Sequence, residues 1–339
     1  MSAERPRRYA YLHQKTIFYR EPVRRHSTGL LQQTTYTLER DTGACYNEAM
    51  IVDFHTHVFP PRMKEDRHRY AQADAGFARL YSSPRARMAT ADELVSRMDR
   101  DGVDVSVILN GGWATADFCA EVNDYILESV ARYPRRLVGF CAPPLATGDV
   151  TSPQAREAAV REVERCVAGG ARGVGELRPD TQMLQGPEAP DIRALVEVIR
   201  KHRLVLLVHT SEPVGHVYAG KGKATPDVVY SLITAYPDVR VVCAHWGGGL
   251  PFYALMPEVK EGLTNTYFDT AASPFLYTPQ VYRAVADLVG AEKVLFGSDC
   301  PLLPQKRLLT EIASAGLSRE EKELVLSGNA SRLLGMGTG

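Results

Sequence analysis

Short apolar runs alternate with longer stretches of helical periodicity from Met50 to the end of the chain. The apolar runs are nearly continuous, as expected of parallel strands that helices cover on the outside. Their first residues lie 27 to 52 positions apart, which leaves room for a strand, a loop, a helix and a second loop. The pattern predicts eight strands: Ile51–Phe54, Val103–Leu109, Leu137–Cys141, Ala171–Glu176, Leu204–His209, Val239–His245, Thr266–Asp269 and Val294–Asp299.

The stretches between these strands carry helix signals. Thr90–Arg100 begins with a capping threonine and places Leu94 and Met98 one turn apart. Strict alternation of eight strands with helices predicts an α/β fold, a (β/α)8 TIM barrel. A doubly wound sheet is the alternative, although roughly five to seven strands would then be more typical. Further helices are predicted at Ala116–Tyr133, Ser152–Ala168, Pro190–His202, Thr225–Tyr236, Thr278–Leu288 and Ser318–Leu326.

One connection is too long for a simple barrel turn. Val58–Arg87 follows the first predicted strand and is rich in arginine and aromatic residues. In a barrel this places a long loop over the catalytic mouth, where it would act as a lid or a substrate-binding insertion. We expect Arg62 and Arg67 to bind a substrate carboxylate, since arginine pairs with carboxylates through two hydrogen bonds. A solvated surface loop is the alternative.

The first 49 residues differ from the rest. They hold eight basic and five acidic groups, a net charge of +3, and show no sustained period of 2 or 3.6 residues. They lack the apolar core of a secretory signal. We expect residues 1–49 to be an N-terminal extension with little order, or a leader translated from a misplaced start codon. Residues 50–339 would then form one barrel domain.

Composition excludes several classes of protein. The chain has 40 basic and 40 acidic residues among 339, so it lacks the basic excess of a nucleic-acid binder. No apolar stretch approaches about 18 residues, which argues against a membrane span. Six cysteines without a CxxC pair indicate reduced thiols in a cytoplasmic protein. We expect a small-molecule substrate, and we leave open whether the chain forms a homodimer.

Potential metal ligands or bases stand at the ends of five predicted strands: His55 and His57, Glu176, His209, His245 and Asp299. Asp269 stands near the end of another strand. His55 and His57 are two positions apart, so on an extended strand they point to the same face. Imidazole and carboxylate groups suit a divalent cation such as Zn²⁺. Since barrel enzymes carry their catalytic groups at this end, the pattern predicts a metal-dependent enzyme.

These motifs together resemble the amidohydrolase superfamily, and more closely the amidohydrolase-related branch that contains the aminocarboxymuconate-semialdehyde decarboxylase-like enzymes. The resemblance covers about residues 50–335 and rests on the strand-end motifs together with the closing segment. These motifs are Val52-Asp53-Phe54-His55-Thr56-His57, His209, Ala244-His245-Trp246-Gly247-Gly248, Phe296-Gly297-Ser298-Asp299-Cys300-Pro301 and Gly328-Asn329-Ala330-Ser331-Arg332-Leu333-Leu334.

The resemblance implies roles for individual residues. His55, His57, His209 and Asp299 would bind one divalent metal ion, which is most often zinc in this branch, with Mn²⁺ as the alternative. His245 would be the catalytic base beside the metal, and Asp299 would also accept a proton. Three roles are open for Glu176: a ligand that bridges to a second metal, a hydrogen-bond partner of His209, or an ion-pair partner of Arg178.

Two tryptophans stand close to these motifs. Trp113 follows the second predicted strand, in a segment that could line the pocket, and Trp246 follows His245. We expect both to bind substrate. The glycines at 247–249 favour a tight turn that brings the backbone close behind His245, with an anion cradle as the alternative.

Three functions agree with this site. In the first, which we favour from sequence, metal-bound hydroxide attacks a small carboxylate-bearing ester, lactone or amide. In the second, the metal site promotes non-oxidative decarboxylation of a small unsaturated or aromatic acid. The third is a catalytically inactive barrel that acts as a binding protein, which would have lost ligands; none of the expected ligands is missing from this sequence.

Overall fold

Eight parallel strands form one sheet in which each strand pairs with the next along the chain. The computed structural model describes residues 50–113, 115–145, 152–182 and 186–336, so the prediction for residues 1–49 lies outside the described part. The strands are β1 Val52–His57, β2 Val105–Leu109, β3 Leu137–Cys141, β4 Gly173–Leu177, β5 Val205–Val208, β6 Val241–Cys243, β7 Thr266–Asp269 and β8 Val294–Leu295.

The segment after β8 closes the sheet against β1. Phe54 N donates to Phe296 O at 2.7 Å, and His57 N donates to Cys300 O at 2.8 Å. Asp299 N donates back to His55 O at 2.9 Å. These bonds join the first and last strands although β8 itself is only two residues long. The predicted (β/α)8 TIM barrel is therefore confirmed.

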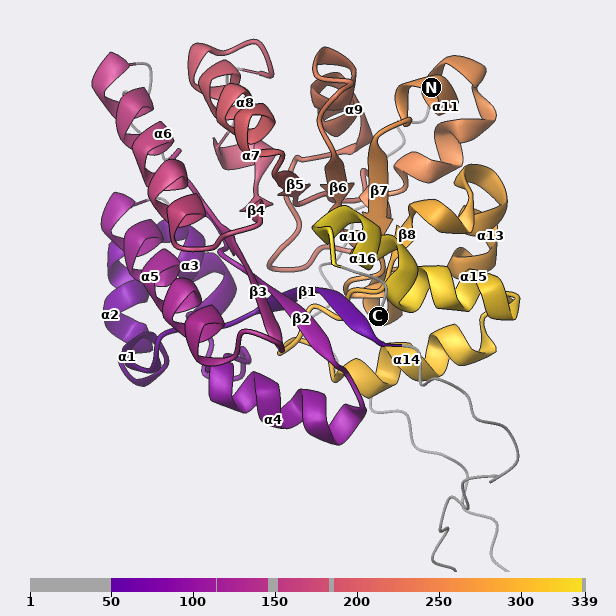
Figure 1. The fold of residues 1–339 in the computed structure, drawn as a ribbon, viewed down its shortest axis with the longest axis horizontal. Coiled ribbons are helices and arrows are strands. Elements are labelled where there is room, and N and C mark those ends of the chain that lie inside the picture. Colours follow the sequence, from indigo (N-terminus) through magenta and orange to yellow (C-terminus); the bar gives the residue numbers. More distant parts are fainter. Residues whose placement is uncertain (1–49, 114, 146–151, 183–185, 337–339) are drawn as a thin grey trace, which may run out of the picture. The chain divides into compact units, whose positions relative to one another are not determined.

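Helices surround the strands (Figure 1). The long ones are amphipathic: α4 begins with a capping box between Thr90 and Glu93 and buries Leu94 and Met98. They are α4 Ala91–Asp101, α5 Ala116–Arg132, α6 Pro153–Ala168, α8 Pro190–His202, α9 Pro226–Ala235, α13 Gln280–Val289 and α14 Gln305–Ser314. Shorter ones are α7 Pro179–Gln182, α10 Ala244–Gly247, η1 Leu250–Leu255, α11 Pro257–Gly262, α12 Ser273–Leu276, η2 Ala291–Lys293, α15 Arg319–Glu323, η3 Leu324–Gly328 and α16 Asn329–Leu334.

The insertion after β1 is helical where the sequence led us to expect a loop. It forms α1 Pro61–Glu65, α2 Arg67–Ala73 and α3 Ala75–Tyr81. Asp74 caps α3 by accepting a hydrogen bond from Phe77 N at 2.8 Å. The three helices bury Met63, Tyr70 and Phe77. These residues recur every seven positions, a helical signal that the many charged neighbours conceal.

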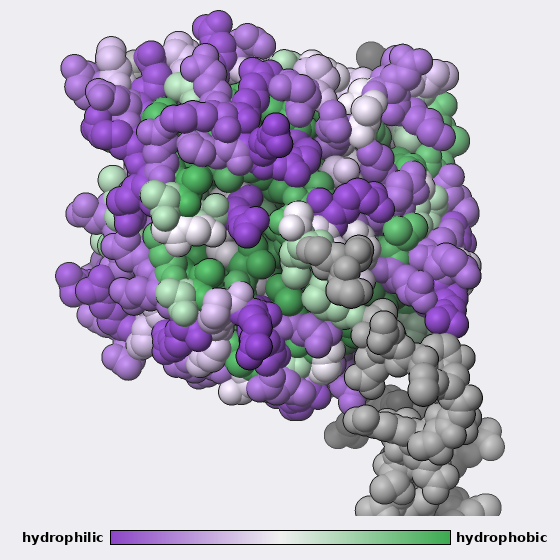
Figure 2. Space-filling view, viewed as in Figure 1, coloured by the Kyte–Doolittle hydropathy of each residue, from purple (hydrophilic) through white to green (hydrophobic). Residues whose placement is uncertain are grey.

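Apolar side chains fill both the barrel interior and the layer between strands and helices. Phe54, Val107, Leu207 and Val242 are fully buried in the interior cluster. Figure 2 shows one face, on which hydrophilic residues surround a central area of hydrophobic ones. Among the described helices, none is both long enough and apolar enough to cross a bilayer.

Candidate active site and metal centre

Six polar side chains gather at the carboxyl ends of the strands. His55 and His57 lie on β1 and Glu176 lies on β4. His209, His245 and Asp299 follow β5, β6 and β8. All six line or adjoin one cavity, and His55 has no exposed surface. The structure thus brings together every residue that the sequence placed at the metal site.

Four donor atoms of this group lie at separations that suit a shared cation. His55 Nε2 and His57 Nε2 are 3.1 Å apart. Asp299 Oδ1 is 3.4 Å from His57 Nε2 and 3.9 Å from His55 Nε2. Glu176 Oε2 lies 3.5 and 3.7 Å from the same two nitrogens. Ligands about 2.0–2.1 Å from a tetrahedral ion are roughly 3.4 Å apart, so these distances suit one divalent ion between the two imidazoles and a carboxylate. Two groups of three side chains have donor atoms close enough to share an ion: His55, His57 and Asp299, and His55, Glu176 and His245. We call the donor atoms of His55, His57, Glu176 and Asp299 the four-donor group.

A hydrogen bond at Nδ1, on the side of the ring away from the other metal-site donors, fixes the orientation of His55. Its Nδ1 donates to Asp269 Oδ2 at 2.7 Å, and both side chains are fully buried. When the ring is neutral, its proton lies on Nδ1 and the lone pair of Nε2 points toward His57. Burial alone would lower the pKa of His55, but Asp269 and Glu176 outweigh burial and hold it well above its usual value. The raised pKa means that a second proton binds readily at Nε2. A cation at Nε2 would compete with that proton.

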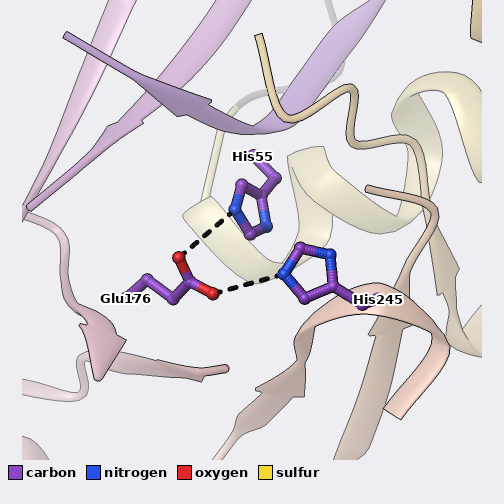
Figure 3. Close-up of side chains that lie close together, drawn as sticks. All are labelled: His55, Glu176 and His245. Atoms are coloured by element: carbon purple, nitrogen blue, oxygen red, sulfur yellow. Dashed lines mark ion pairs between the residues drawn. The ribbon is translucent and has the colours of Figure 1, made fainter. Parts of the chain in front are cut away.

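Glu176 lies between two pairs of histidines. Its Oε2 faces His55 and His57, whereas its Oε1 is 2.8 Å from His209 Nδ1 and 3.4 Å from His245 Nε2. Figure 3 shows the carboxylate between His55 and His245. Burial alone would raise the pKa of Glu176, but hydrogen bonding to His209 and His245 holds it well below its usual range. The carboxylate is therefore ionised and contacts His209 while it also reaches the four-donor group.

His209 has partners for both ring nitrogens. Nδ1 contacts Glu176 Oε1, and Nε2 lies 3.1 Å from Ser211 Oγ. Burial and the positive charge of Arg178 lower the pKa of His209 to about 4, which keeps the ring neutral. It stands beside the four-donor group rather than within it, and its role as a metal ligand stays a prediction.

His245 sits on a tight left-handed turn, with φ 56°. Its backbone N–H donates to Asp269 Oδ1 at 2.9 Å, and its ring Nδ1 is 3.1 Å from Ala271 O. Since a carbonyl can only accept, Nδ1 carries a proton, and Nε2 faces the Glu176 carboxylate. Burial alone would lower the pKa of His245, but Glu176 raises it to about 9. The Glu176 carboxylate thus favours the protonated form of His245, whose ring faces the cavity.

The turn behind His245 depends on glycine. Gly248 has φ 60°, and a Cβ there would lie 2.4 Å from the backbone oxygen of Ser211. Trp246 is fully buried, and its Nε1 donates to Ser273 Oγ at 2.9 Å. It packs against Tyr282 and is not among the residues that line the cavity.

A cavity of about 410 Å³ opens above these side chains. Trp113 lines it and packs edge-on to Tyr81 at 6.0 Å between ring centres. Arg62 and Arg67 do not line it, since Arg62 pairs with Glu121 and Arg67 donates to the Ser83 carbonyl. The residues that line it are His57, Leu80, Tyr81, Ala86, Arg87, Gly111, Trp113, Glu176, Arg178, His209, His216, Tyr218, Ala219, Gly220, His245, Ala272, Phe275, Leu276, Asp299, Pro301 and Leu302.

Sequence reasoning missed two features of this cavity. The arginines that line it are Arg87, which ends the insertion predicted to bind substrate, and Arg178, which the sequence suggested only as a partner of Glu176. Asp269 supports both His55 and His245. Asp269 could have been found from its position at the end of a predicted strand. Arg178 could have been found from its position two residues after Glu176.

A barrel with clustered histidines and carboxylates at the carboxyl ends of its strands defines a class of metal-dependent barrel enzymes. Residues 52–336 match the Amidohydrolase family, and the chain belongs to that family. The resemblance seen in the sequence motifs is thereby confirmed.

Curated relatives and solved structures share most of this chain. A 2-amino-3-carboxymuconate-6-semialdehyde decarboxylase of Dictyostelium discoideum is 24% identical, covering 85% of this chain and 92% of its own. A gamma-resorcylate decarboxylase of Polaromonas is 22% identical over 71% of this chain and 86% of its own. The structure of a 5-carboxyvanillate decarboxylase of Novosphingobium aromaticivorans with manganese and 4-hydroxy-3-methoxy-5-nitrobenzoic acid has TM-score 0.68 and 15% identity, covering 85% of this chain and 97% of that chain.

These relatives are decarboxylases. The comparisons therefore favour the decarboxylase alternative over the hydrolysis that we favoured from sequence alone. The structural neighbour was solved with manganese, whereas we had expected zinc.

Proposed function

We propose that this chain is a metal-dependent, non-oxidative decarboxylase of a small aromatic or unsaturated carboxylic acid. The observation that carries the proposal is the position of His245, which lines the cavity with its Nε2 3.4 Å from Glu176 Oε1, beside the four-donor group. Loss of CO₂ leaves a carbanion that needs a proton, whereas hydrolysis needs a group that takes one up. Decarboxylases among the relatives support this assignment.

One divalent ion would be held by His55, His57, Glu176 and Asp299. When bound, it supplies a Lewis acid that draws electrons from the oxygens of the substrate. Burial alone would raise the pKa of Asp299, but hydrogen bonding to His57 and the charge of the nearby histidines lower it, so this residue stays a carboxylate. Two nitrogen and two oxygen donors suit Mn²⁺ as well as Zn²⁺.

The cavity matches a flat, apolar acid. Tyr81, Trp113 and Phe275 provide aromatic surface, which favours stacking with a planar substrate. Arg87 and Arg178 provide positive charge at the same cavity. Arg178 is held in place by a 2.9 Å hydrogen bond from Nη2 to Gly220 O. A substrate that combines a planar ring or diene with a carboxylate uses both kinds of surface.

The proton step needs only the residues of this chain. His245 would donate its Nε2 proton to the carbon that loses CO₂ as the carbon–carboxylate bond breaks. Nδ1 keeps its own proton because Ala271 O accepts from it, so the imidazole returns to the same neutral tautomer after each transfer. A solvent proton then restores the imidazolium, and no oxidant is consumed.

A substrate panel tests the proposal. Protein loaded with Mn²⁺ or Zn²⁺ is incubated with small hydroxybenzoic and unsaturated acids, and with lactones and esters of similar size. We expect CO₂ from at least one acid and no acid release from the esters. Acid release without CO₂ would restore hydrolysis as the better assignment.

A further inference from the structure

Asp53 is a fully buried carboxylate that none of the steps above uses. Its Oδ1 accepts from Ser298 N at 2.9 Å and from His55 N at 3.2 Å. Its Oδ2 accepts from Ser298 Oγ at 2.5 Å and from Gln305 Nε2 at 2.7 Å. Asp53 thus links β1, the segment after β8 and helix α14.

These contacts lie where the barrel closes. The segment after β8 carries Asp299 next to Ser298, and β1 carries His55 two residues after Asp53. Backbone hydrogen bonds join the two segments, among them Asp299 N to His55 O at 2.9 Å. The donor atoms of His55 and Asp299 face each other across this closure at 3.9 Å. A carboxylate that holds both backbones from behind also sets the separation of those two donors.

We propose that Asp53 is a positioning residue that aligns His55 with Asp299 for the cation. It does not touch the metal donors through its side chain; it acts by holding the backbone N–H groups of His55 and Ser298. The inference rests on the proposed metal centre. Burying a carboxylate is energetically unfavourable. The alignment of two ligands that lie 244 residues apart in sequence would explain why one is buried at this position.

Two variants separate hydrogen bonding from charge. Asp53→Asn keeps an oxygen for Ser298 N and His55 N, and its amide can donate to Ser298 Oγ. The amide oxygen of Gln305 is buried without a hydrogen-bond partner among the described residues, so a flip of that amide would let it accept from the new asparagine. Asp53→Ala removes every one of these bonds. Ser106→Ala is the matched control, since it removes a 3.2 Å contact of Gln305 and leaves Asp53 its partners.

The first measurement is Mn²⁺ binding to the full-length protein, by calorimetry and by electron paramagnetic resonance. We expect Asp53→Ala to weaken binding about 10–100-fold, and Asp53→Asn and Ser106→Ala to stay within about threefold of wild type. Equal affinity in Asp53→Ala and wild type would overturn the positioning role. If Asp53→Ala does not fold, Ser298→Ala takes its place, because it removes one donor to Asp53 from the segment that bears Asp299.

The second measurement does not depend on metal binding. Hydrogen exchange reports the amides of His57 and Asp299, which bridge β1 and the segment after β8. In Asp53→Ala we expect both to exchange at least about tenfold faster, with the amides of β4 and β5 unchanged. Unchanged exchange at His57 and Asp299 would overturn the proposal. If Asp53→Ala exchanges faster at these two amides but wild-type protein itself binds no Mn²⁺, the role of Asp53 in holding the backbone would be supported and the metal centre would be refuted.

Discussion

His55 and Asp269 are joined by a 2.7 Å hydrogen bond between Nδ1 and Oδ2, and neither side chain has any exposed surface. The bond fixes which nitrogen of His55 carries the proton. The other nitrogen, Nε2, then faces His57 Nε2 at 3.1 Å. One buried carboxylate thereby determines whether the donor group presents a lone pair to a cation.

Asp269→Asn tests that relationship. The asparagine oxygen can still accept from the backbone N–H groups of His245 and Ala271, which turns its NH₂ group toward His55 Nδ1. His55 would then accept at Nδ1 and carry its proton on Nε2, where the cation belongs. We expect Mn²⁺ affinity to fall about 10–100-fold, measured by calorimetry. Asp238→Asn, which changes an exposed partner of Arg200, is the control and should bind normally.

Replacing both histidines of β1 tests the metal centre itself. Wild-type protein dialysed against Mn²⁺ or Zn²⁺ should retain about one equivalent per chain by elemental analysis, and His55→Ala with His57→Ala should retain none. His68→Ala removes an exposed imidazole of α2 and should leave the metal content unchanged. Two equivalents in wild type would favour the bridging role of Glu176 with a second ion, and metal retained by the double variant would refute the assignment of these ligands.

Packing within the insertion after β1 should contribute both to the stability of the fold and to the shape of the cavity. Phe77 is fully buried and packs edge-on against Trp113 at 5.5 Å between ring centres. Phe77→Ala should lower the free energy of unfolding by about 3–5 kcal/mol in denaturant titrations. Loss of support for Trp113 should also weaken the binding of aromatic acids. Phe252→Ala truncates a side chain that is 40% exposed and should change stability little. Equal effects of the two variants would contradict this packing account.

Gly248 should tolerate no side chain. Alanine there would combine a strained left-handed backbone with a Cβ 2.4 Å from Ser211 O, so the turn that holds His245 must move. We expect Gly248→Ala to lower the turnover number by a larger factor than that by which it changes the Michaelis constant. Gly316→Ala has a similar φ of +70° but no atom within 4 Å of the new Cβ. It should cost about 1–2 kcal/mol of stability, because alanine is strained at this φ, and leave turnover unchanged. A matching loss of turnover would contradict a specific role for Gly248.

The strand ends could be predicted because parallel strands leave their carboxyl termini at one end of the barrel. The two-residue spacing of His55 and His57 is enough to place both on the same face. His209, His245 and Asp299 needed only the strand order, which the spacing of apolar runs supplies. Local pattern thus indicated the metal centre before any contact was known.

Contacts across long sequence separations could not be predicted in this way. Arg62 turns away from the cavity because helices form in the insertion and bring it to Glu121, 59 residues further along the chain. Asp53 meets Ser298 across 245 residues at the barrel closure. Neither partner carries a local signal, so tertiary packing alone decides which arginine lines the cavity and which carboxylate supports the ligands.

The central claim is that this site removes CO₂ and delivers a proton to the carbon left behind. The most direct test is to incubate Mn²⁺-loaded protein with the carboxyl-¹³C form of an accepted acid in D₂O, and to analyse both products by mass spectrometry. We predict one ¹³CO₂ per molecule consumed and one deuterium at the carbon that lost it, with neither formed by His55→Ala with His57→Ala. Consumption of substrate with the label retained in an acid product would contradict the account.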